Sequence, residues 1–568
     1  MENQKENADQ RILGSRFFSK SVHISPHTII IIILAIAAIS LKFFLLFERL
    51  LFIDPDEGYY LILARNLITG NGYTFNGLPN VVFPPFLPIL IAFFYLICQD
   101  FQFSLIFITA ISGGLLGIIS YKIAQKKFSS FIPVLCAFLV FFIYQLNAFL
   151  PLYLTPYVTV LYRGSDILNC FLIITSVFLV VRLVEKDKNL FAILAGGFFA
   201  LSYLTRPEGI LLLLMILVCL VFLKIVSLIS ISYKKIFVFF LAFLLFASPY
   251  ILYLKNTTGK WSLSGKISTA KEHRESLLDV IKNDNWVFFS KVHYSFDKEN
   301  MEMDQVYWGF HDKIKVDEKA SIRYFFNIIF ENLKMYPVIP KILLPLYILI
   351  FFLVGLANAA YKIVKRKSTI DIILFIFFPY SLLITALAYP IPRHHLFLVP
   401  VFCIYAVEGI VLISSFLAKN KNVLKNIILM LLFLIIILFM GYDYKNNLSF
   451  NCLKIPSLRK PLEVDSFISE YLKKRKAQTI MSVHPSFAVR AISDWQVLPQ
   501  APLVDIIQFG KHKNVDHIVL PDPNQRKNFY YIADLRNSYI PTDSADKFGY
   551  IIIEKSEYFH LINFVKKK

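Results

Sequence analysis

The chain has 568 residues, of which 57% are hydrophobic and 16% aromatic, and its formal net charge is +20. Apolar runs long enough to cross about 30 Å of hydrocarbon recur through the first 441 positions, which excludes a soluble globular protein and indicates a polytopic membrane protein. The basic residues lie mainly in short loops between these runs, so they report topology and do not indicate a nucleic-acid partner.

The apolar runs predict about eleven membrane-spanning helices. A basic tail, 1–27, precedes the first run, which continues too far for a cleaved signal peptide and is expected to be retained. The positive charge in the short loops places this tail and those loops on the cytoplasmic side. The predicted spans are 28–47, 103–121, 128–150, 166–184, 190–205, 208–230, 235–254, 341–361, 369–389, 394–416 and 423–441.

Three carboxylates directly follow the first span. Asp54 is suited to cap a helix, Pro55 to its first position, and Glu57 to the acidic position of a capping box. Asp56 has no such structural duty. We expect it at the N-terminal end of a helix that stops at Gly70, close to the membrane surface, where its carboxylate could act as a general base. The alternative is a capped surface helix with a spare acid.

The run 83–98 is ambiguous, because its sixteen residues are few for a crossing and it opens with Phe83-Pro84-Pro85-Phe86-Leu87-Pro88. If it crosses the membrane, the basic loop 122–127 lies outside. If it stays in the outer interface, every basic short loop falls on the cytoplasmic side. The second choice predicts a first external loop over 48–102 and an external C-terminus.

Two further external regions are expected. The long loop 255–340 mixes aromatic and charged residues and is assigned no role. After Tyr442 the sequence becomes water-soluble and predicts a small α/β domain over 442–568 with a binding or stabilising role. Its predicted strands are 479–483, 496–499, 517–520 and 550–553, and its predicted helices are 487–492 and 504–510.

Polar residues unnecessary for topology gather on the external face. Arg163-Gly164-Ser165-Asp166 lies at the outer end of the fourth span, Arg206 follows the fifth, and Arg393-His394-His395 precedes the tenth. A reaction that deprotonates a hydroxyl and expels a lipid-linked phosphate needs a carboxylate base and guanidinium groups. For each residue alone, anchoring of a span end is an equally good explanation.

These ordered features resemble the polytopic GT-C glycosyltransferases, in the branch of the protein O-mannosyltransferases and lipid A aminoarabinose transferases. The similarity covers most of 28–441. It rests on Asp56-Glu57-Gly58-Tyr59-Tyr60 with Ala64-Arg65 and Gly70-Asn71-Gly72-Tyr73, Phe83 to Pro88, Ser165-Asp166-Ile167-Leu168, Leu204-Thr205-Arg206-Pro207-Glu208-Gly209, and Arg393 to Pro400.

The resemblance implies candidate catalytic acids at Asp56, Glu57 and Asp166. It implies donor-phosphate ligands at Arg206 and Arg393, and we add His394 to that candidate set. Phe83 stands where the branch has a basic residue before its Pro-Pro pair, so an aminoarabinose-type donor is not implied. The domain 442–568 inherits nothing from the resemblance.

The sequence therefore predicts an α-helical polytopic membrane protein with a small external α/β domain, acting as an inverting glycosyltransferase. Its expected partners are a polyprenyl-phosphate-linked sugar donor, membrane lipid, and a lipid, glycan or protein acceptor on the external or periplasmic face. A transporter or lipid flippase is the first alternative, and a non-catalytic assembly or adhesion protein the second. Paired acids are compatible with a divalent cation, but no cofactor is indicated. None of the six cysteines forms a C-x-x-C pair, so no zinc site is expected.

Overall fold

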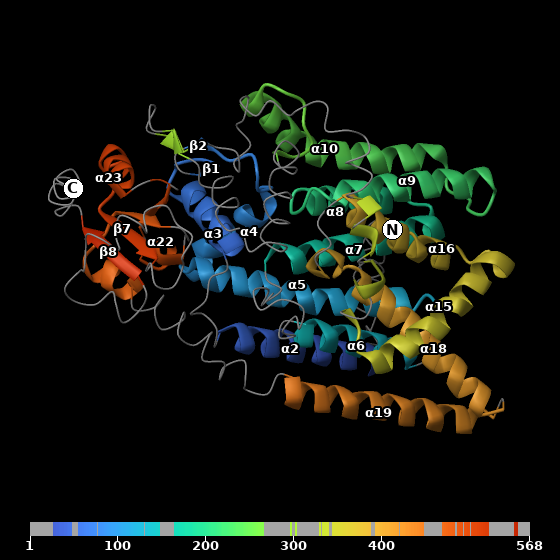
Figure 1. Cartoon of the computed structure of the whole chain (residues 1–568). Helices are drawn as coiled ribbons and strands as arrows, with labels where there is room; N and C mark the ends of the chain where they lie inside the picture. The colour runs from blue at the N-terminus through green and yellow to red at the C-terminus, as the bar shows by residue number, and fades with distance from the viewer. Residues whose placement is uncertain are drawn as a thin grey trace, which may run out of the picture.

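The computed structural model shows a bundle of helices with a small α/β domain at one end (Figure 1). In the first half of the chain it describes residues 26–47, 55–75, 78–129, 131–147 and 164–265. In the second half it describes 296–297, 302–303, 329–330, 332–334, 336–339, 343–387, 392–419, 421–447, 468–482, 486–491, 493–499, 501, 503–521 and 550–554. Most of the predicted loop 255–340 lies outside these residues, as do Asp54 and Arg163.

Each of the eleven predicted spans coincides with a helix, except that 369–389 forms two consecutive helices, so the prediction of a helical polytopic protein is confirmed. The helices are α2 (Pro26–Phe47), α5 (Phe101–Ala124), α6 (Ile132–Asn147), α7 (Ser165–Lys186), α8 (Asn189–Tyr203), α9 (Gly209–Ile225), α10 (Tyr233–Thr258), α15 (Leu346–Arg366), α16 (Thr369–Phe375), α17 (Phe377–Leu387), α18 (Leu398–Leu417) and α19 (Asn422–Asn447). Among the described residues, eight helical segments are long and apolar enough to cross a membrane. The helices α6, α8 and α9 are shorter apolar helices.

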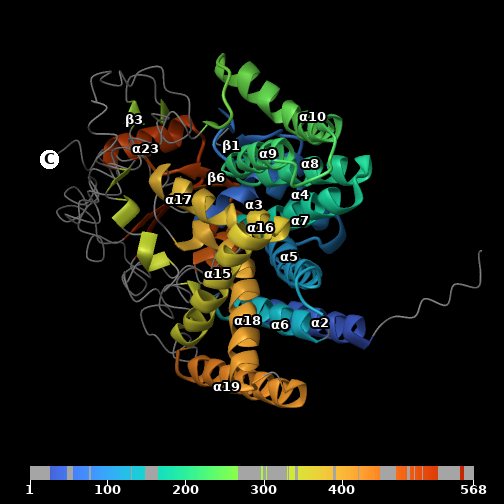
Figure 2. The same ribbon diagram turned by 90° about the vertical axis from the view of Figure 1, so that its right-hand side faces the viewer.

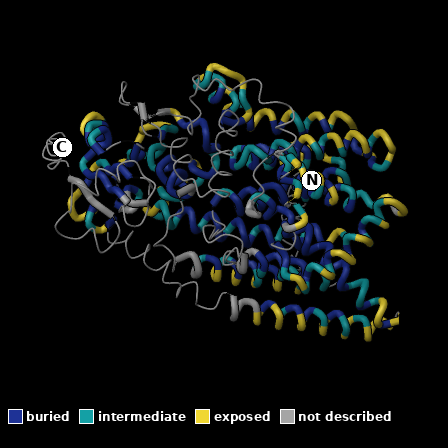
Figure 3. Tube along the Cα trace, in the orientation of Figure 1, coloured by how far each residue is buried: buried dark blue, intermediate teal, exposed yellow. Residues whose placement is uncertain are grey.

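The bundle has an inner and an outer set of helices (Figures 1 and 2). In the most apolar stretches of α7 and α18, 78% of the residues are buried, but in those of α2, α15 and α19 only 22% are. The outer helices expose large apolar side chains such as Ile33, Leu353 and Leu438. Figure 3 shows such exposed positions along α19. An apolar outer surface of this kind is expected where lipid, and not water, surrounds the protein.

The ambiguous run 83–98 forms the short helix α4 (Phe86–Cys98). Its 13 residues span about 20 Å, which is less than the thickness of the hydrocarbon core. Gln99 then adopts a left-handed conformation, and the side chain of Asp100 accepts a hydrogen bond of 2.8 Å from Phe103 N. The chain therefore ends α4 and starts α5 within two residues, and that α4 does not cross the membrane stays a prediction.

The first loop begins with α3 (Pro55–Ile68), so the predicted helix start at Pro55 is confirmed. The helix ends just before Gly70, whose φ of +81° is the left-handed conformation that glycine adopts without strain. A short hairpin follows, formed by β1 (Thr74–Phe75) and β2 (Leu78–Pro79). Two short strands, β3 (Phe296–Asp297) and β4 (Glu302–Met303), and two 3-10 helices, η3 (Tyr336–Val338) and η4 (Pro392–His395), are also described.

The C-terminal domain contains a four-stranded sheet in the order β6-β5-β7-β8. Its central strand β5 (Thr479–Ser482) pairs in parallel with β6 (Asp494–Val497) and β7 (His517–Pro521), and β8 (Tyr550–Glu554) pairs antiparallel to β7. The helices α22 (Ser486–Ala491) and α23 (Leu503–His512) connect the strands. The predicted strands and helices are all present, but β6 begins at Asp494, two residues before its predicted start at 496. An exposed aspartate at the start of an edge strand does not look like a strand residue in the sequence.

Four charged side chains form a cluster that we call the sealed cluster: Lys127, Asp371 and Glu408, whose side chains are buried, and Lys362, which is partly exposed at its rim. Lys127 Nζ pairs with Asp371 Oδ1, and it lies 2.6 Å from Glu408 Oε2. Lys362 Nζ lies 2.6 Å from Glu408 Oε1. The expectation that cytoplasmic basic residues serve topology alone is therefore too simple, because these two lysines also hold four segments of the bundle together.

Close packing of α15 against α18 makes the sealed cluster compact. A side chain at Gly355 would clash with the carbonyl oxygen of Tyr405, and one at Gly409 would clash with that of Phe351. Glycine at both positions lets the two backbones touch, which places Lys362 of α15 beside Glu408 of α18.

Candidate active site

The helix α3 carries two of the predicted catalytic acids. Asp56 lies in its first turn, and its side chain is outside the described part of the chain. Glu57 is buried, with 6% of its surface exposed. The following residues from Tyr59 to Ala64 are all buried. A helix buried over this length holds the backbone at Asp56 in a fixed position relative to the bundle.

The clearest polar grouping at this end of the bundle is formed by Asp166, Arg206 and Glu208, which we call the open cluster. Arg206 Nη1 donates to Asp166 Oδ1, and Arg206 Nη2 donates to Glu208 Oε1 over 3.3 Å. The exposed fractions of the three side chains are 8% for Asp166, 15% for Arg206 and 30% for Glu208. The two carboxylates therefore orient a guanidinium that is shielded from solvent but not sealed off.

Local backbone geometry fixes Asp166 at the start of α7. Gly164, with φ +58°, precedes the helix in a conformation that strains other residues, and its N–H donates to Thr109 Oγ1 over 3.1 Å. A side chain at Gly164 would meet Leu105 and Leu87 at 3.3 and 3.4 Å. The first turn of α7 thus rests against both α4 and α5.

Arg206 is positioned by the turn between α8 and α9. Its N–H donates to the carbonyl of Ser202 over 2.8 Å, and the Ser202 hydroxyl donates to Asn169 Oδ1 of α7 over 2.7 Å. The N–H of Phe86 at the start of α4 donates to the carbonyl of Leu204 over 2.9 Å. The segment that opens with Pro84-Pro85 is therefore joined directly to the segment that carries Arg206.

The third contributor is η4 together with Tyr380 and Ser381 in the first half of α17. Tyr380 donates from its hydroxyl to the backbone carbonyl of Glu208 over 3.2 Å. His395 is fully buried and its Nδ1 lies 2.8 Å from Ser381 Oγ. His395 precedes the span formed by α18. Burial, with a smaller contribution from the positive charge of Arg206, lowers the pKa of His395 to about 4, so that the ring is neutral near pH 7.

The two other predicted residues of this segment are placed less directly. Arg393 lies in η4, two residues before His395, and its side chain is outside the described part of the chain. His394 is half-buried in the same turn. The structure thus brings Asp166, Arg206 and the backbone of η4 to one end of the bundle.

Sequence reasoning did not assign roles to Glu208 or His395. Both residues belong to candidate external polar segments, Arg206-Pro207-Glu208 and Arg393-His394-His395, so the sequence does place them near the predicted site. The sequence could not show the contact of Glu208 with α17: Tyr380, which donates to the backbone carbonyl of Glu208, is 172 positions away.

The described residues contain no group of three or more histidine, cysteine, aspartate and glutamate side chains that could hold a metal ion. The roles of Asp56, Glu57, Asp166, Arg206, Arg393 and His394 stay predictions at this point.

No protein-family model and no curated protein matches the sequence. Solved structures with similar folds include the oligosaccharyltransferase of Archaeoglobus fulgidus in the apo form, with a TM-score of 0.54 and 12% identity over 91% of this chain and 71% of that chain. The same archaeal protein, AglB, in complex with an inhibitory peptide and a dolichol-phosphate, gives a TM-score of 0.51 at 12% identity over 89% and 70%. ArnT from Cupriavidus metallidurans bound to undecaprenyl phosphate gives 0.53 at 12% identity over 92% and 98%. The chain therefore shares its fold with this archaeal oligosaccharyltransferase and with ArnT.

Proposed function

We propose that this protein is a membrane glycosyltransferase that takes a sugar from a polyprenyl-phosphate-linked donor and passes it to an acceptor on the external face. The observation that carries the proposal is the open cluster, in which two carboxylates orient Arg206 at one end of a GT-C fold. A glycosyltransferase that uses a lipid-linked donor needs an oriented cation of this kind beside the membrane.

The donor class is inferred from chemistry and from the neighbours. Two of the similar solved structures hold polyprenyl phosphates, a dolichol-phosphate and undecaprenyl phosphate. A guanidinium has five N–H donors, and the contacts of Arg206 with the described residues use one donor on each of two nitrogens. Arg206 therefore retains donors for a phosphate.

Charge balance indicates that Arg206 does not act alone. Within the open cluster itself, the carboxylates of Asp166 and Glu208 offset the positive charge of the one guanidinium. A phosphate group needs further positive charge, and we propose that Arg393 supplies it, because η4 also contributes His395 beside Arg206. His394 is a further candidate in the same turn.

In the proposed reaction, an acceptor hydroxyl gives its proton to the Asp56 carboxylate and its oxygen forms a bond to the anomeric carbon of the sugar. The bond between that carbon and the phosphate oxygen breaks, and its electron pair leaves with the polyprenyl phosphate. Arg206 and Arg393 stabilise the charge that develops on the phosphate. A single displacement inverts the configuration at the anomeric carbon. Glu57 and Asp166 act as supporting acids.

The donor site is tested with the purified protein in liposomes. We expect Arg206→Ala and Arg393→Ala to weaken the binding of a polyprenyl-phosphate sugar by roughly 10- to 100-fold, since each removes charge-assisted hydrogen bonds. Lysine at either position should restore binding only in part, because it cannot contact the phosphate in a bidentate manner. Donor affinity is measured by titration.

A matched control is Arg182→Ala, because Arg182 lies near the other end of α7, where it pairs with Glu185 at 3.1 Å. This variant should bind the donor as the wild type does. Unchanged donor affinity in both Arg206→Ala and Arg393→Ala would refute the proposed donor site.

A further inference from the structure

The edge strand β6 of the C-terminal domain lies against the helix that carries Asp56. Figures 1 and 2 both show this domain beside α3, and α22 contacts α3 as well. The two elements are more than 400 positions apart in the sequence, since Arg65 and Ser493 are separated by 428 positions. Their contact is therefore a product of the fold and cannot arise from local chain geometry.

An aromatic cluster crosses this interface. The ring of Trp495 on β6 lies 5.0 Å from the ring of Phe75 and 5.6 Å from the ring of Tyr59 on α3. Tyr59 in turn lies 5.3 Å from Phe83. All four rings are buried, with at most 6% of each residue exposed. Aromatic contacts of this geometry are stronger than their buried area alone implies.

Trp495 is also held by its own domain. Its indole N–H lies 3.2 Å from the carbonyl oxygen of Ser482 and 3.0 Å from the hydroxyl oxygen of the same residue, at the end of β5. The C-terminal domain fixes the polar edge of Trp495, and the ring of Trp495 packs against Tyr59 and Phe75. The position of the C-terminal domain therefore determines where α3 can lie.

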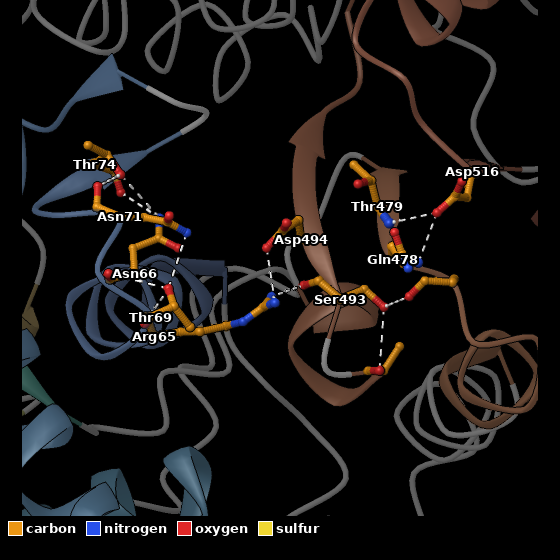
Figure 4. A network of polar contacts seen from close by, with 12 residues as sticks. Arg65, Asn66, Thr69, Asn71, Thr74, Gln478, Thr479, Ser493, Asp494 and Asp516 are labelled. Atoms are coloured by element: carbon orange, nitrogen blue, oxygen red, sulfur yellow. Dashed lines mark hydrogen bonds and ion pairs between the residues drawn. The ribbon is translucent and has the colours of Figure 1, made fainter.

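Polar contacts of Arg65 reinforce the aromatic cluster. Figure 4 shows the Arg65 side chain extending from α3 to the C-terminal domain, where Nη1 donates to the carbonyl of Ser493 and Nη2 lies 3.0 Å from Asp494 Oδ1. The Ser493 hydroxyl donates to the carbonyl of Ala477 over 2.6 Å, which fixes the loop that receives Arg65. Arg65 therefore binds an ordered backbone carbonyl as well as a carboxylate.

A chain of contacts connects the aromatic cluster to the open cluster. The carbonyl of Phe83 accepts hydrogen bonds from Tyr73 Oη at 2.6 Å and from Asn80 Nδ2 at 2.9 Å, which fix the start of the Pro84-Pro85 segment. Phe86 then donates to the carbonyl of Leu204, two residues before Arg206. Contacts thus run without a break from Trp495 through Phe83 to the segment of Arg206.

We propose that the C-terminal domain positions α3, and with it Asp56, relative to the open cluster, and that Arg65 and Trp495 are the positioning residues. The proposal rests on the proposed function, since it assigns importance to the placement of Asp56. It gives the C-terminal domain a defined part in turnover without any contact between that domain and the sugar.

The test uses the full-length protein and two readouts, sugar transfer and hydrogen exchange of the α3 amides. We expect Arg65→Ala to lower kcat about tenfold with the donor KM unchanged, and to raise exchange in α3. Asp494→Ala should have a smaller effect, about two- to threefold, because Arg65 keeps its contact with Ser493. The double variant should be no worse than Arg65→Ala alone, since both changes remove one interaction.

Lys474→Ala is the matched control, because it breaks an exposed ion pair with Glu470, four residues away within the C-terminal domain. It should change neither readout. Trp495→Phe, which keeps an aromatic ring at the interface, should lower kcat less than Trp495→Ala, and folding of both is checked by the exchange of β5.

Unchanged exchange in α3 and unchanged kcat in Arg65→Ala would overturn the positioning role, and so would effects of Arg65→Ala and Asp494→Ala that add in full. The exchange readout does not depend on activity. If Asp56 is unimportant for turnover, the proposed function fails while increased exchange in α3 still reports the docking of the domain.

Discussion

Two charged clusters lie near opposite ends of the 22-residue helix α7. The open cluster contains Asp166 in the first turn of α7. The sealed cluster lies at the other end, where Glu185 of α7 pairs with Lys126, the neighbour of Lys127, at 2.7 Å. Both consist of acids and bases in ion pairs, so their difference shows what separates a structural charge cluster from a reactive one in this fold.

The sealed cluster is balanced in charge, and its central ion pairs are buried. Its two lysines match its two carboxylates, and Asn358 and Ser368 add hydrogen bonds of 2.5 and 2.6 Å to the carboxylates. Lys127, Asp371 and Glu408 each expose only 2% of their side chains, whereas Lys362 at the rim exposes 29%. In the open cluster none of the three side chains is as fully buried as that core, since the exposed fractions are 8% for Asp166, 15% for Arg206 and 30% for Glu208. Ion pairs buried to this degree hold the helices together, whereas a guanidinium that is only partly covered can also contact a ligand.

The largest effect on stability is expected when an acid is removed from the sealed cluster. Glu408→Ala leaves Lys362 without its buried partner and Lys127 with only Asp371, so we expect a loss of about 3 to 5 kcal/mol in the free energy of unfolding. Activity per folded molecule should be nearly unchanged. Denaturation in mild detergent, followed together with sugar transfer, measures both.

Glu185→Ala is the corresponding control, because the Lys126–Glu185 pair lies nearby but exposes 26% and 32% of its side chains. An exposed pair contributes at most about 1 kcal/mol. Equal losses in the two variants would mean that burial does not distinguish the sealed cluster.

A change of pH should have a smaller effect on the free energy of unfolding, through His395 beside the open cluster. The folded protein keeps His395 neutral until its pKa of about 4, whereas an unfolded histidine takes up a proton as the pH falls below about 6.5. Protonation therefore favours the unfolded state between these two values, and stability falls by up to about 3 kcal/mol as the pH drops through this window. In His395→Gln this part of the acid sensitivity should be absent.

The measurement is the apparent melting temperature of wild type and His395→Gln at several pH values between 7 and 4. The wild type should lose more stability on acidification than the variant. Parallel curves for the two proteins would show that His395 is not held neutral beside Arg206.

The sequence was sufficient for everything determined by local patterns. Apolar periodicity located the helices, and Asp54-Pro55 before an apolar helix located the start of α3. The contacts within the two clusters join residues that are far apart in the sequence. Hydropathy and capping patterns describe only neighbouring residues and therefore cannot predict these contacts. Lys127 and Asp371 are 244 positions apart, so nothing in the sequence around either residue indicates that the two form an ion pair. The same holds for Arg65 and Asp494.

The central claim of this account is that the end of the bundle containing the open cluster performs chemistry with Asp56 as the base. It is tested most directly by the turnover of a polyprenyl-phosphate sugar by Asp56→Asn, with Asp54→Asn as the control, since asparagine caps a helix as well as aspartate does. We predict that Asp56→Asn folds normally and loses activity by roughly 10²- to 10⁴-fold, the usual contribution of a general base, while Asp54→Asn keeps most of its activity. Wild-type turnover by Asp56→Asn would contradict the claim and leave Asp56 as a residue in the first turn of α3 without a catalytic role.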